Sequence, residues 1–203
     1  MEPSLFDPRE QQVNMDARIV YALERVSEAF RVLLWRETRS SGLSPIQAQL
    51  LIFLLYHSDD KNRVSYLAHE FNMTKATISE VVKTLVTKKL AVKQSDPKDS
   101  RSSMIRLTPK GEEIARRAAL FAAQLRGPLT GMSEEQKENF FTSVMDFLHG
   151  LQKSGVLGMQ RMCHSCNHFE RRDSSDHFCR VYQVDMPGRN LRIDCSDHSP
   201  SRA

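Results

Sequence analysis

The chain has 203 residues, enough for one domain of ordinary size and an appendage. Hydrophobic residues make up 40% and charged residues 27%, as in water-soluble globular proteins, and no apolar run reaches the roughly 18 residues of a membrane span. The net charge is only +4, and the N-terminus lacks the basic start and apolar core of a signal peptide. We therefore expect a cytoplasmic protein without a membrane partner, in a compartment that keeps thiols reduced.

Two helices are predicted in the first part of the chain. Apolar residues recur every three or four positions over residues 13–39, the period of one long amphipathic helix. The segment SSGLSPIQ ends that helix and begins another. Ser44 is a suitable N-cap, Pro45 suits the first helical position and Gln47 completes a capping box. We expect this second helix to end near His57.

The segment VSYLAHEFNMTKATISEVVKTLVTKKL predicts a helix-turn-helix. Residues 64–71 form a short helix, Asn72 and Met73 turn the chain, and Thr74 can cap the next helix. That longer helix carries an apolar stripe made of Ile78, Val81, Val82, Leu85 and Val86. A short helix, a tight turn and a longer helix with a polar outer face is the arrangement that places a recognition helix on DNA.

A β-hairpin is predicted directly after the recognition helix, in the position of a wing. Residues 91–94 and 104–107 can pair as strands, with the turn-rich segment SDPKDSRS between them. Its tip holds Lys98 and Arg101, which can reach phosphates or a narrow minor groove. Nine lysine and arginine residues lie between positions 75 and 110. Such a basic block indicates phosphate binding, and a solvated helix face is the alternative.

Helical periodicity returns after Pro109 and is expected to break at RGPLTG, residues 126–131. A last helix then begins with Ser133 as its cap and Glu134 in its first turn, and the chain loosens at SGVLG. We therefore expect a winged helix and dimerisation domain over residues 1–158 and a cysteine-rich metal-binding extension over residues 159–203. The sequence has no glycine-rich phosphate loop and no G-x-S-x-G motif, so we expect no enzyme.

Over about residues 13–153 the sequence resembles the MarR family of winged helix-turn-helix regulators. The segments that carry the resemblance are LSPIQAQLL, LAHEFNMTKATISEVVKTLVTKKLAVK and DSRSSMIRLTPKG. The resemblance implies a mainly α-helical fold with a small β wing, and a homodimer in which the first helix and the last two helices knot together. It also implies a transcriptional regulator, most often a repressor, that binds double-stranded DNA at a pseudo-palindromic operator with half-sites about 10 bp apart.

The family resemblance further implies a pocket for a small-molecule effector between the dimerisation and winged regions. Trp35, Arg36 and Arg39 are candidates to line it, and Trp35 as part of the dimer core is the simpler interpretation.

The expected DNA contacts combine the start of the recognition helix with the wing. Free N–H groups and short hydroxyls at a helix start suit phosphates and base edges. Asp99 can orient the Arg101 guanidinium through a charge-assisted hydrogen bond. The alternative for this pair is a surface ion pair worth under about 1 kcal/mol. The full set is Thr74, Lys75, Thr77, Ser79, Lys83, Lys98, Asp99 and Arg101.

All four cysteines lie near the end of the chain, at Cys163, Cys166, Cys179 and Cys195. A C-x-x-C pair such as the first two presents two thiolates to a metal. Structural zinc sites more often use two such pairs, whereas iron–sulfur ligands are frequently single, as the last two are here. The segment has few large apolar residues, so a metal would supply folding free energy. Its spacing also resembles small HiPIP-like segments, which implies a 4Fe–4S cluster.

We favour this iron–sulfur cluster, which would sense redox state, oxygen or iron. One alternative is a structural zinc site, with a small-molecule effector doing the sensing; another is a thiol switch in which Cys163 and Cys166 form a disulfide. In each case we expect the centre to change the spacing between the two recognition helices of a dimer. The histidines that can replace a cysteine at zinc are His164, His168, His177 and His198. We interpret His57, His69 and His149 as surface or helix-end residues.

Overall fold

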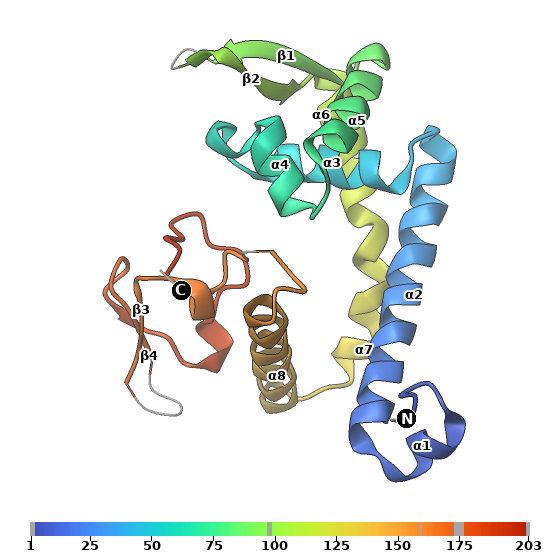
Figure 1. The fold of residues 1–203 in the computed structure, drawn as a ribbon, viewed down its shortest axis with the longest axis vertical. Helices are drawn as coiled ribbons and strands as arrows, with labels where there is room; N and C mark the ends of the chain where they lie inside the picture. The colour runs from blue at the N-terminus through green and yellow to red at the C-terminus, as the bar shows by residue number, and fades with distance from the viewer. Residues whose placement is uncertain (1–2, 97–98, 159, 173–176, 202–203) are drawn as a thin grey trace.

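The computed structural model describes residues 3–96, 99–158, 160–172 and 177–201, and Figure 1 shows their arrangement. The described part is mainly helical, with one two-stranded and one three-stranded antiparallel sheet. This confirms the predicted fold class.

The helix predicted over residues 13–39 is present as α2 (Met15–Ser41), and a short helix that the sequence reasoning did not predict, α1 (Pro8–Val13), precedes it. Asn14 separates them because its backbone is extended, with φ −115° and ψ 118°. Its side-chain oxygen accepts hydrogen bonds from the N–H groups of Asp16 and Ala17, so Asn14 caps α2.

The winged part follows the predicted order. Its elements are α3 (Pro45–Tyr56), η1 (Asp59–Lys61), α4 (Val64–Glu70), α5 (Lys75–Thr87), β1 (Ala91–Asp96), β2 (Asp99–Leu107) and α6 (Pro109–Ala118). The predicted capping box of Ser44 and Gln47 is present, and Thr74 accepts from the Thr77 N–H at 3.1 Å. Asn72 turns the chain with a φ of +50°. These local signals are therefore confirmed.

The wing is longer than predicted, with Ala91 opposite Leu107 at its base and Asp96 opposite Asp99 near its tip. Its base is attached to the chain before α4, because the Ile105 N–H donates to the Asn62 carbonyl at 2.9 Å. Figure 1 shows the hairpin extending away from α5. The core beneath lies among α3, α4, α5 and the wing, and its largest fully buried side chains include Leu50, Leu51, Leu67, Ile78, Leu85 and Ile105.

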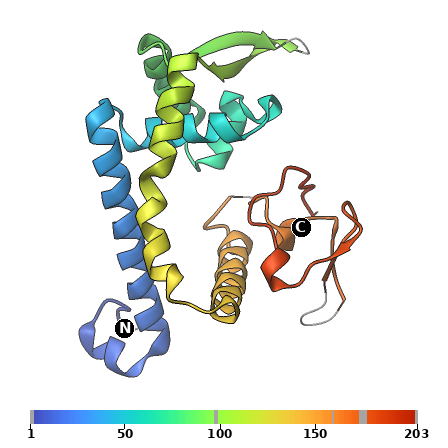
Figure 2. The same cartoon turned by 180° about the vertical axis from the view of Figure 1, so that it is seen from behind.

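The predicted break at RGPLTG is wrong in position. The 3-10 segment η2 (Ala119–Leu125) continues from α6, and α7 (Arg126–Thr130) follows it, so the chain stays helical until Gly131. Pro128 lies in the first turn of α7, where its missing N–H costs no helical hydrogen bond. Both views show this run of helices alongside α2, with α8 (Glu134–Lys153) folding back after it (Figures 1 and 2).

The cysteine-rich segment contains η3 (Cys163–Ser165), β3 (Phe169–Arg171), β4 (His177–Cys179), β5 (Val184–Asp185) and η4 (Gly188–Asn190). It does not stand apart from the helices. Met145 of α8 is fully buried in a second, small core together with Met162, Cys163, Met186 and Leu191. Helix α8 thus supports the cysteine-rich segment.

Large apolar side chains remain exposed along α2 and α8. They include Ile19, Leu23, Val26, Phe30, Trp35, Phe140 and Phe147. No helix in the described part of the chain has the length and apolar character needed to cross a membrane.

Candidate DNA interface and cysteine centre

The outer face of α5 carries the predicted contacts of the recognition helix. Lys75, Thr77 and Lys83 are exposed and Ser79 is half-buried, while the opposite face of the helix is buried in the core. The Thr74 oxygen serves as the N-cap and lies 2.8 Å from the Thr77 hydroxyl oxygen. The helix therefore presents a polar, positively charged surface at its free N-terminus.

A groove of about 550 Å³ lies between α5 and the wing. Ser79 and Lys83 of the predicted set line it, together with Lys93 of β1, which the sequence reasoning did not select. Lys93 belongs to the basic block of residues 75–110, and its place on β1 beside α5 is what brings it into the groove. Lys83 lies 3.5 Å from Glu80, and both side chains are more than 70% exposed, so this ion pair is weak and open to competition by a phosphate.

The wing tip is only partly described. Asp99 and Arg101 belong to β2, but their side chains lie outside what the structure describes, and Lys98 is outside the described residues altogether. The predicted Asp99–Arg101 hydrogen bond thus remains a prediction. Further along β2, Arg106 forms an ion pair with Asp59 of η1, which attaches the wing base to the helical core.

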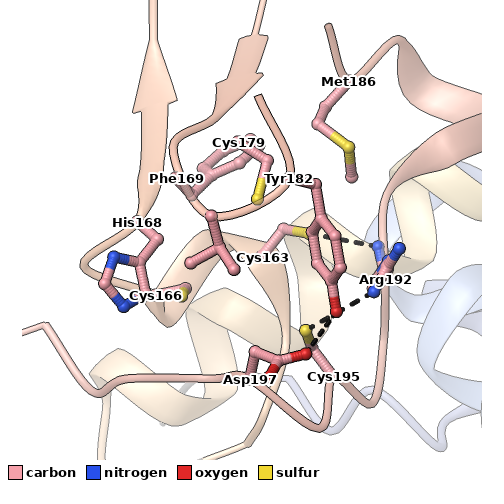
Figure 3. A pocket seen from close by; sticks show the side chains of 11 residues that line it. Cys163, Cys166, His168, Phe169, Cys179, Tyr182, Met186, Arg192, Cys195 and Asp197 are labelled. Atoms are coloured by element: carbon pink, nitrogen blue, oxygen red, sulfur yellow. Dashed lines mark hydrogen bonds between the residues drawn. The ribbon is translucent and has the colours of Figure 1, made fainter. Parts of the chain in front are cut away.

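All four cysteines line one cavity in the C-terminal segment (Figure 3). Cys163 begins η3, Cys166 caps its end, Cys179 ends β4, and Cys195 lies in the loop after η4. The cavity leaves about 20 Å³ for the centres of water-sized spheres, more than the roughly 10–15 Å³ that one water requires. Phe169, Tyr182 and Met186 stand among the sulfurs.

Hydrogen-bond donors point at two of the four sulfurs. The Arg192 N–H lies 3.1 Å from Cys163 Sγ, and the Arg192 guanidinium lies 3.9 Å from Cys195 Sγ. That guanidinium stacks on the Tyr182 ring at 3.9 Å, and the Tyr182 hydroxyl donates to Asp197. Burial raises the pKa of the Cys163 thiol, and the neighbouring thiols add to the rise.

The thiols surround the cavity instead of converging on one point. Within the described ranges, no group of three or more His, Cys, Asp or Glu side chains is arranged to hold a single metal ion. A zinc site needs such convergence, with sulfurs about 2.3 Å from the ion. In a 4Fe–4S cluster each thiolate binds a different iron, so the ligands stand further apart around a larger group.

The four histidines proposed as substitutes at zinc have different surroundings. His168 lines the cavity, whereas the Nε2 atom of His198 lies 3.0 Å from the Ser165 hydroxyl. The rings of His164 and His177 both pack against Phe169, with centroids 5.6 and 5.0 Å from its ring. Burial lowers the pKa of His164 to about 4, so its ring is neutral near pH 7.

A cluster of charged and polar side chains joins the cysteine-rich segment to the helix-turn-helix. Arg161 donates to both carboxylate oxygens of Glu70, at 2.5 and 3.2 Å, and to the Tyr66 hydroxyl at 2.9 Å. It also donates to Asp194 at 2.7 Å. Burial disfavours the charge of Arg161, but the hydrogen bonds to Asp194 and Glu70 outweigh it and raise its pKa.

His57 belongs to the same cluster, so its interpretation as a simple helix-end residue was incomplete. It is the C-cap of α3, yet its side chain is only 16% exposed and stacks on Phe53 at 3.8 Å. Its Nε2 lies 2.8 Å from Asp194 Oδ2. This hydrogen bond, with those from Arg161, holds the pKa of Asp194 well below its usual range. Of the other two histidines, His69 is exposed and His149 is half-buried beside His164.

A further cavity, of about 310 Å³, lies between α2, α3 and η2. It does not involve Trp35, Arg36 or Arg39, the residues considered for an effector pocket; its lining is Ser27, Phe30, Arg31, Leu34, Pro45, Gln49 and Phe121. Trp35 is 54% exposed in this chain, with the Arg39 guanidinium 5.3 Å from its ring centroid.

Comparisons with known proteins agree with this architecture. The MarR family model matches residues 41–102, which contain α3, the helix-turn-helix and most of the wing. An uncharacterized HTH-type transcriptional regulator of Bacillus subtilis, YdgJ, is 31% identical over 98 residues, which are 48% of this chain and 57% of that protein. The match thus spans little more than half the length of this curated relative.

Two solved structures share the fold. The MepR–DNA complex of Staphylococcus aureus aligns with a TM-score of 0.57 and 22% identity, over 65% of this chain and 96% of that one. MarR of Staphylococcus aureus, in complex with salicylate and kanamycin, aligns with a TM-score of 0.58 and 17% identity, over 71% and 97%. Both alignments leave out roughly a third of this chain. The MarR family model thus matches the winged part of this chain, and the two solved structures share its fold.

Proposed function

We propose that the chain is a DNA-binding transcriptional regulator, acting as a dimeric repressor on a pseudo-palindromic operator. The observation that carries this proposal is the exposed polar face of α5 beside a wing, with Lys83 and Lys93 in one groove. A recognition helix and a wing on one side of a domain match the width of a major groove and its flanking minor groove. The MepR relative was solved with DNA, which agrees with this use of the fold.

The apolar side chains exposed along α2 and α8 support a homodimer. Phe30 is 42% exposed and Trp35 54% exposed, values that are costly for isolated large side chains but expected where a second copy covers them. A two-fold dimer would set two recognition helices one DNA turn apart.

We further propose that the four cysteines hold a 4Fe–4S cluster that modulates DNA binding. The support is that all four thiols line one cavity. The Arg192 N–H and guanidinium face two of the sulfurs, and such donors stabilise the negative charge of cluster thiolates. The cluster, when bound, would supply oxidation states and a lability that the protein side chains lack.

The DNA proposal is tested with Arg101→Ala and Lys137→Ala, compared by fluorescence anisotropy on a duplex from upstream of the coding region. Arg101 stands on the wing, whereas Lys137 lies on α8 and pairs only with Glu134 among the described contacts. We expect Arg101→Ala to weaken binding at least tenfold and Lys137→Ala to leave it unchanged, with a dimer in both cases. Equal affinities of all three proteins would contradict the assignment of the wing.

The cluster proposal is tested by purification without oxygen, a visible spectrum, and assays of iron, sulfide and zinc. A brown protein with about four iron and four sulfide per chain is expected. A colourless protein with one zinc per chain would overturn it in favour of a structural site.

One observation favours a second candidate, a regulator with a small-molecule effector. The cavity of about 310 Å³ between α2, α3 and η2 has an apolar wall of Phe30, Leu34 and Phe121 and one charged side chain, Arg31. Displacement of DNA by an aromatic carboxylate such as salicylate, abolished by Arg31→Ala, would support it.

A further inference from the structure

We propose that Arg161 couples the cysteine centre to the helix-turn-helix by clamping helix α4. The inference rests on the proposed function and names the route by which that centre would regulate DNA binding. The residues of this contact, called the Arg161 cluster below, are His57, Tyr66, Glu70, Arg161 and Asp194.

The Arg161 cluster is shared between two parts of the chain. Tyr66 and Glu70 lie four residues apart on α4, so both side chains project from the same face of that helix. Arg161 and Asp194 belong to the cysteine-rich segment and meet there, joined by the bond from Arg161 Nε to Asp194 Oδ1. His57, at the end of α3, joins the cluster through its hydrogen bond with Asp194. The cluster therefore joins α3 and α4 to the tail.

On the tail side, the cluster is bonded directly to the cysteine positions. The Cys195 N–H donates to the Arg161 carbonyl at 2.9 Å, and the Cys163 N–H donates to the Arg192 carbonyl at 2.9 Å. These two hydrogen bonds join the backbone of residues 161–163 to the backbone of residues 192–195. Asp194 immediately precedes Cys195. A change that displaces the backbone of Cys163 or Cys195 is therefore passed on to the backbone that carries Arg161 and Asp194.

On the DNA side, α4 is the first helix of the helix-turn-helix. Its end is bonded to the turn before α5, since the Met73 N–H donates to the Ala68 carbonyl at 2.8 Å. The Arg161 guanidinium also lies 5.5 Å from the Phe53 ring, beneath α4. The linker passes close to the end of α4, because a Cβ built on Gly158 would stand 3.5 Å from the His69 carbonyl oxygen. A displacement of α4 would thus reach the recognition helix through one short turn.

Because Arg161 and Glu70 are both largely buried, the loss of either one leaves the other charge without a partner in a poorly hydrated place. The Arg161 side chain is 10% exposed and that of Glu70 is 20% exposed. If the cysteine-rich segment loosens, Arg161 leaves and a mostly buried Glu70 carboxylate loses its charged partner. Helix α4 must then move or hydrate to solvate that carboxylate. With the centre intact, the cluster holds α4 in one position.

The coupling is tested with Arg161→Met, a matched control Arg189→Met on the exposed end of η4, and Cys195→Ser, which disrupts the centre. Hydrogen–deuterium exchange of residues 64–74 is measured for each protein and for Arg161→Met combined with Cys195→Ser. We expect Cys195→Ser to raise exchange there in the wild-type background and to add nothing once Arg161 is Met. Arg189→Met should match the wild type. Unchanged exchange in Arg161→Met, or fully additive effects, would overturn the proposal.

A second readout separates this proposal from the cluster proposal. Iron and sulfide content judges the cluster, and the exchange experiment judges the coupling whatever the thiols bind. For protein that holds iron, the DNA affinity is measured before and after treatment with a chelator. We expect the two affinities of the wild type to differ by at least about fivefold. In Arg161→Met, loaded with the same amount of iron, we expect the two affinities to be nearly equal. A difference preserved in Arg161→Met would refute the clamp. If Arg161→Met fails to fold, Glu70→Gln, which leaves the tail intact, takes its place in both measurements.

Discussion

Gly111→Ala is the substitution for which this fold predicts the most specific damage. Gly111 is buried in the first turn of α6, directly under the residue that leads into the wing. A Cβ built there would stand 1.9 Å from the Leu90 carbonyl oxygen and 2.9 Å from its carbon. The same region is fixed by two hydrogen bonds of Thr108, whose N–H donates to Leu90 and whose hydroxyl donates to Lys89.

The cost follows from these contacts. Real Cβ atoms essentially never approach closer than 3.0 Å, so α6 and the start of β1 must separate by about 1.1 Å (3.0 minus 1.9). The clashing atom is backbone, so no rotamer change relieves it. Backbone shifts of this kind cost about 1–3 kcal/mol, and weakening the two Thr108 bonds adds about 0.5–1.5 kcal/mol each. We expect a loss of about 2–6 kcal/mol, which at the middle of this range corresponds to roughly 10 °C in Tm for a chain of this size.

Thermal unfolding followed by circular dichroism measures this loss. The matched control is Gly150→Ala, because Gly150 lies in α8 with no atom within 4 Å of its Cβ position. That change should gain about 0.5–1 kcal/mol from helix propensity. A Gly111→Ala protein that melts within about 2 °C of the wild type would refute the packing of α6 against Leu90.

Two further predictions concern the recognition helix. Thr74→Ala removes the N-cap bond to Thr77 and should cost about 1 kcal/mol of stability, measured by urea unfolding, whereas Thr74→Ser should restore most of it. Lys83→Ala removes one exposed cation from the groove beside the wing, so the salt dependence of log K should fall by about one unit of slope without loss of stability; an unchanged slope would place Lys83 away from phosphates.

The sequence predicts the winged part well because its signals are local. Ser44, Thr74 and Ser133 can bond only to nearby N–H groups, so the residue type and its spacing to the next polar residue are enough to place each helix start. Helix α1 was not predicted because its six residues are too short to show an apolar period. Helix α7 was not predicted because glycine and proline occur both at helix starts and in loops, so their presence in RGPLTG does not distinguish the two.

The Arg161 cluster could not be predicted in this way. His57 and Asp194 are 137 positions apart, and no motif links an arginine after α8 to a glutamate at the end of α4. Their contact depends on how the tail docks on the helices. The cavity that Cys179 and Cys195 share with the C-x-x-C pair could be predicted only in part. The spacing predicts a shared site, but the β3–β4 hairpin and the loop after η4 determine where the last two thiols stand.

Removal of the centre should loosen the tail while the winged core stays folded. Among the residues that the structure describes, the small core beneath the cysteines has five buried members, one of which is Cys163, whereas the winged core is far larger. If the thiols hold the proposed cluster, a segment with so little apolar burial draws folding free energy from it. After treatment with an iron chelator and an oxidant, limited proteolysis should cut within residues 160–201 and leave a stable fragment that ends near α8. Equal protection of the tail before and after treatment would contradict this dependence, and loss of the winged fragment would show that the two cores unfold as one.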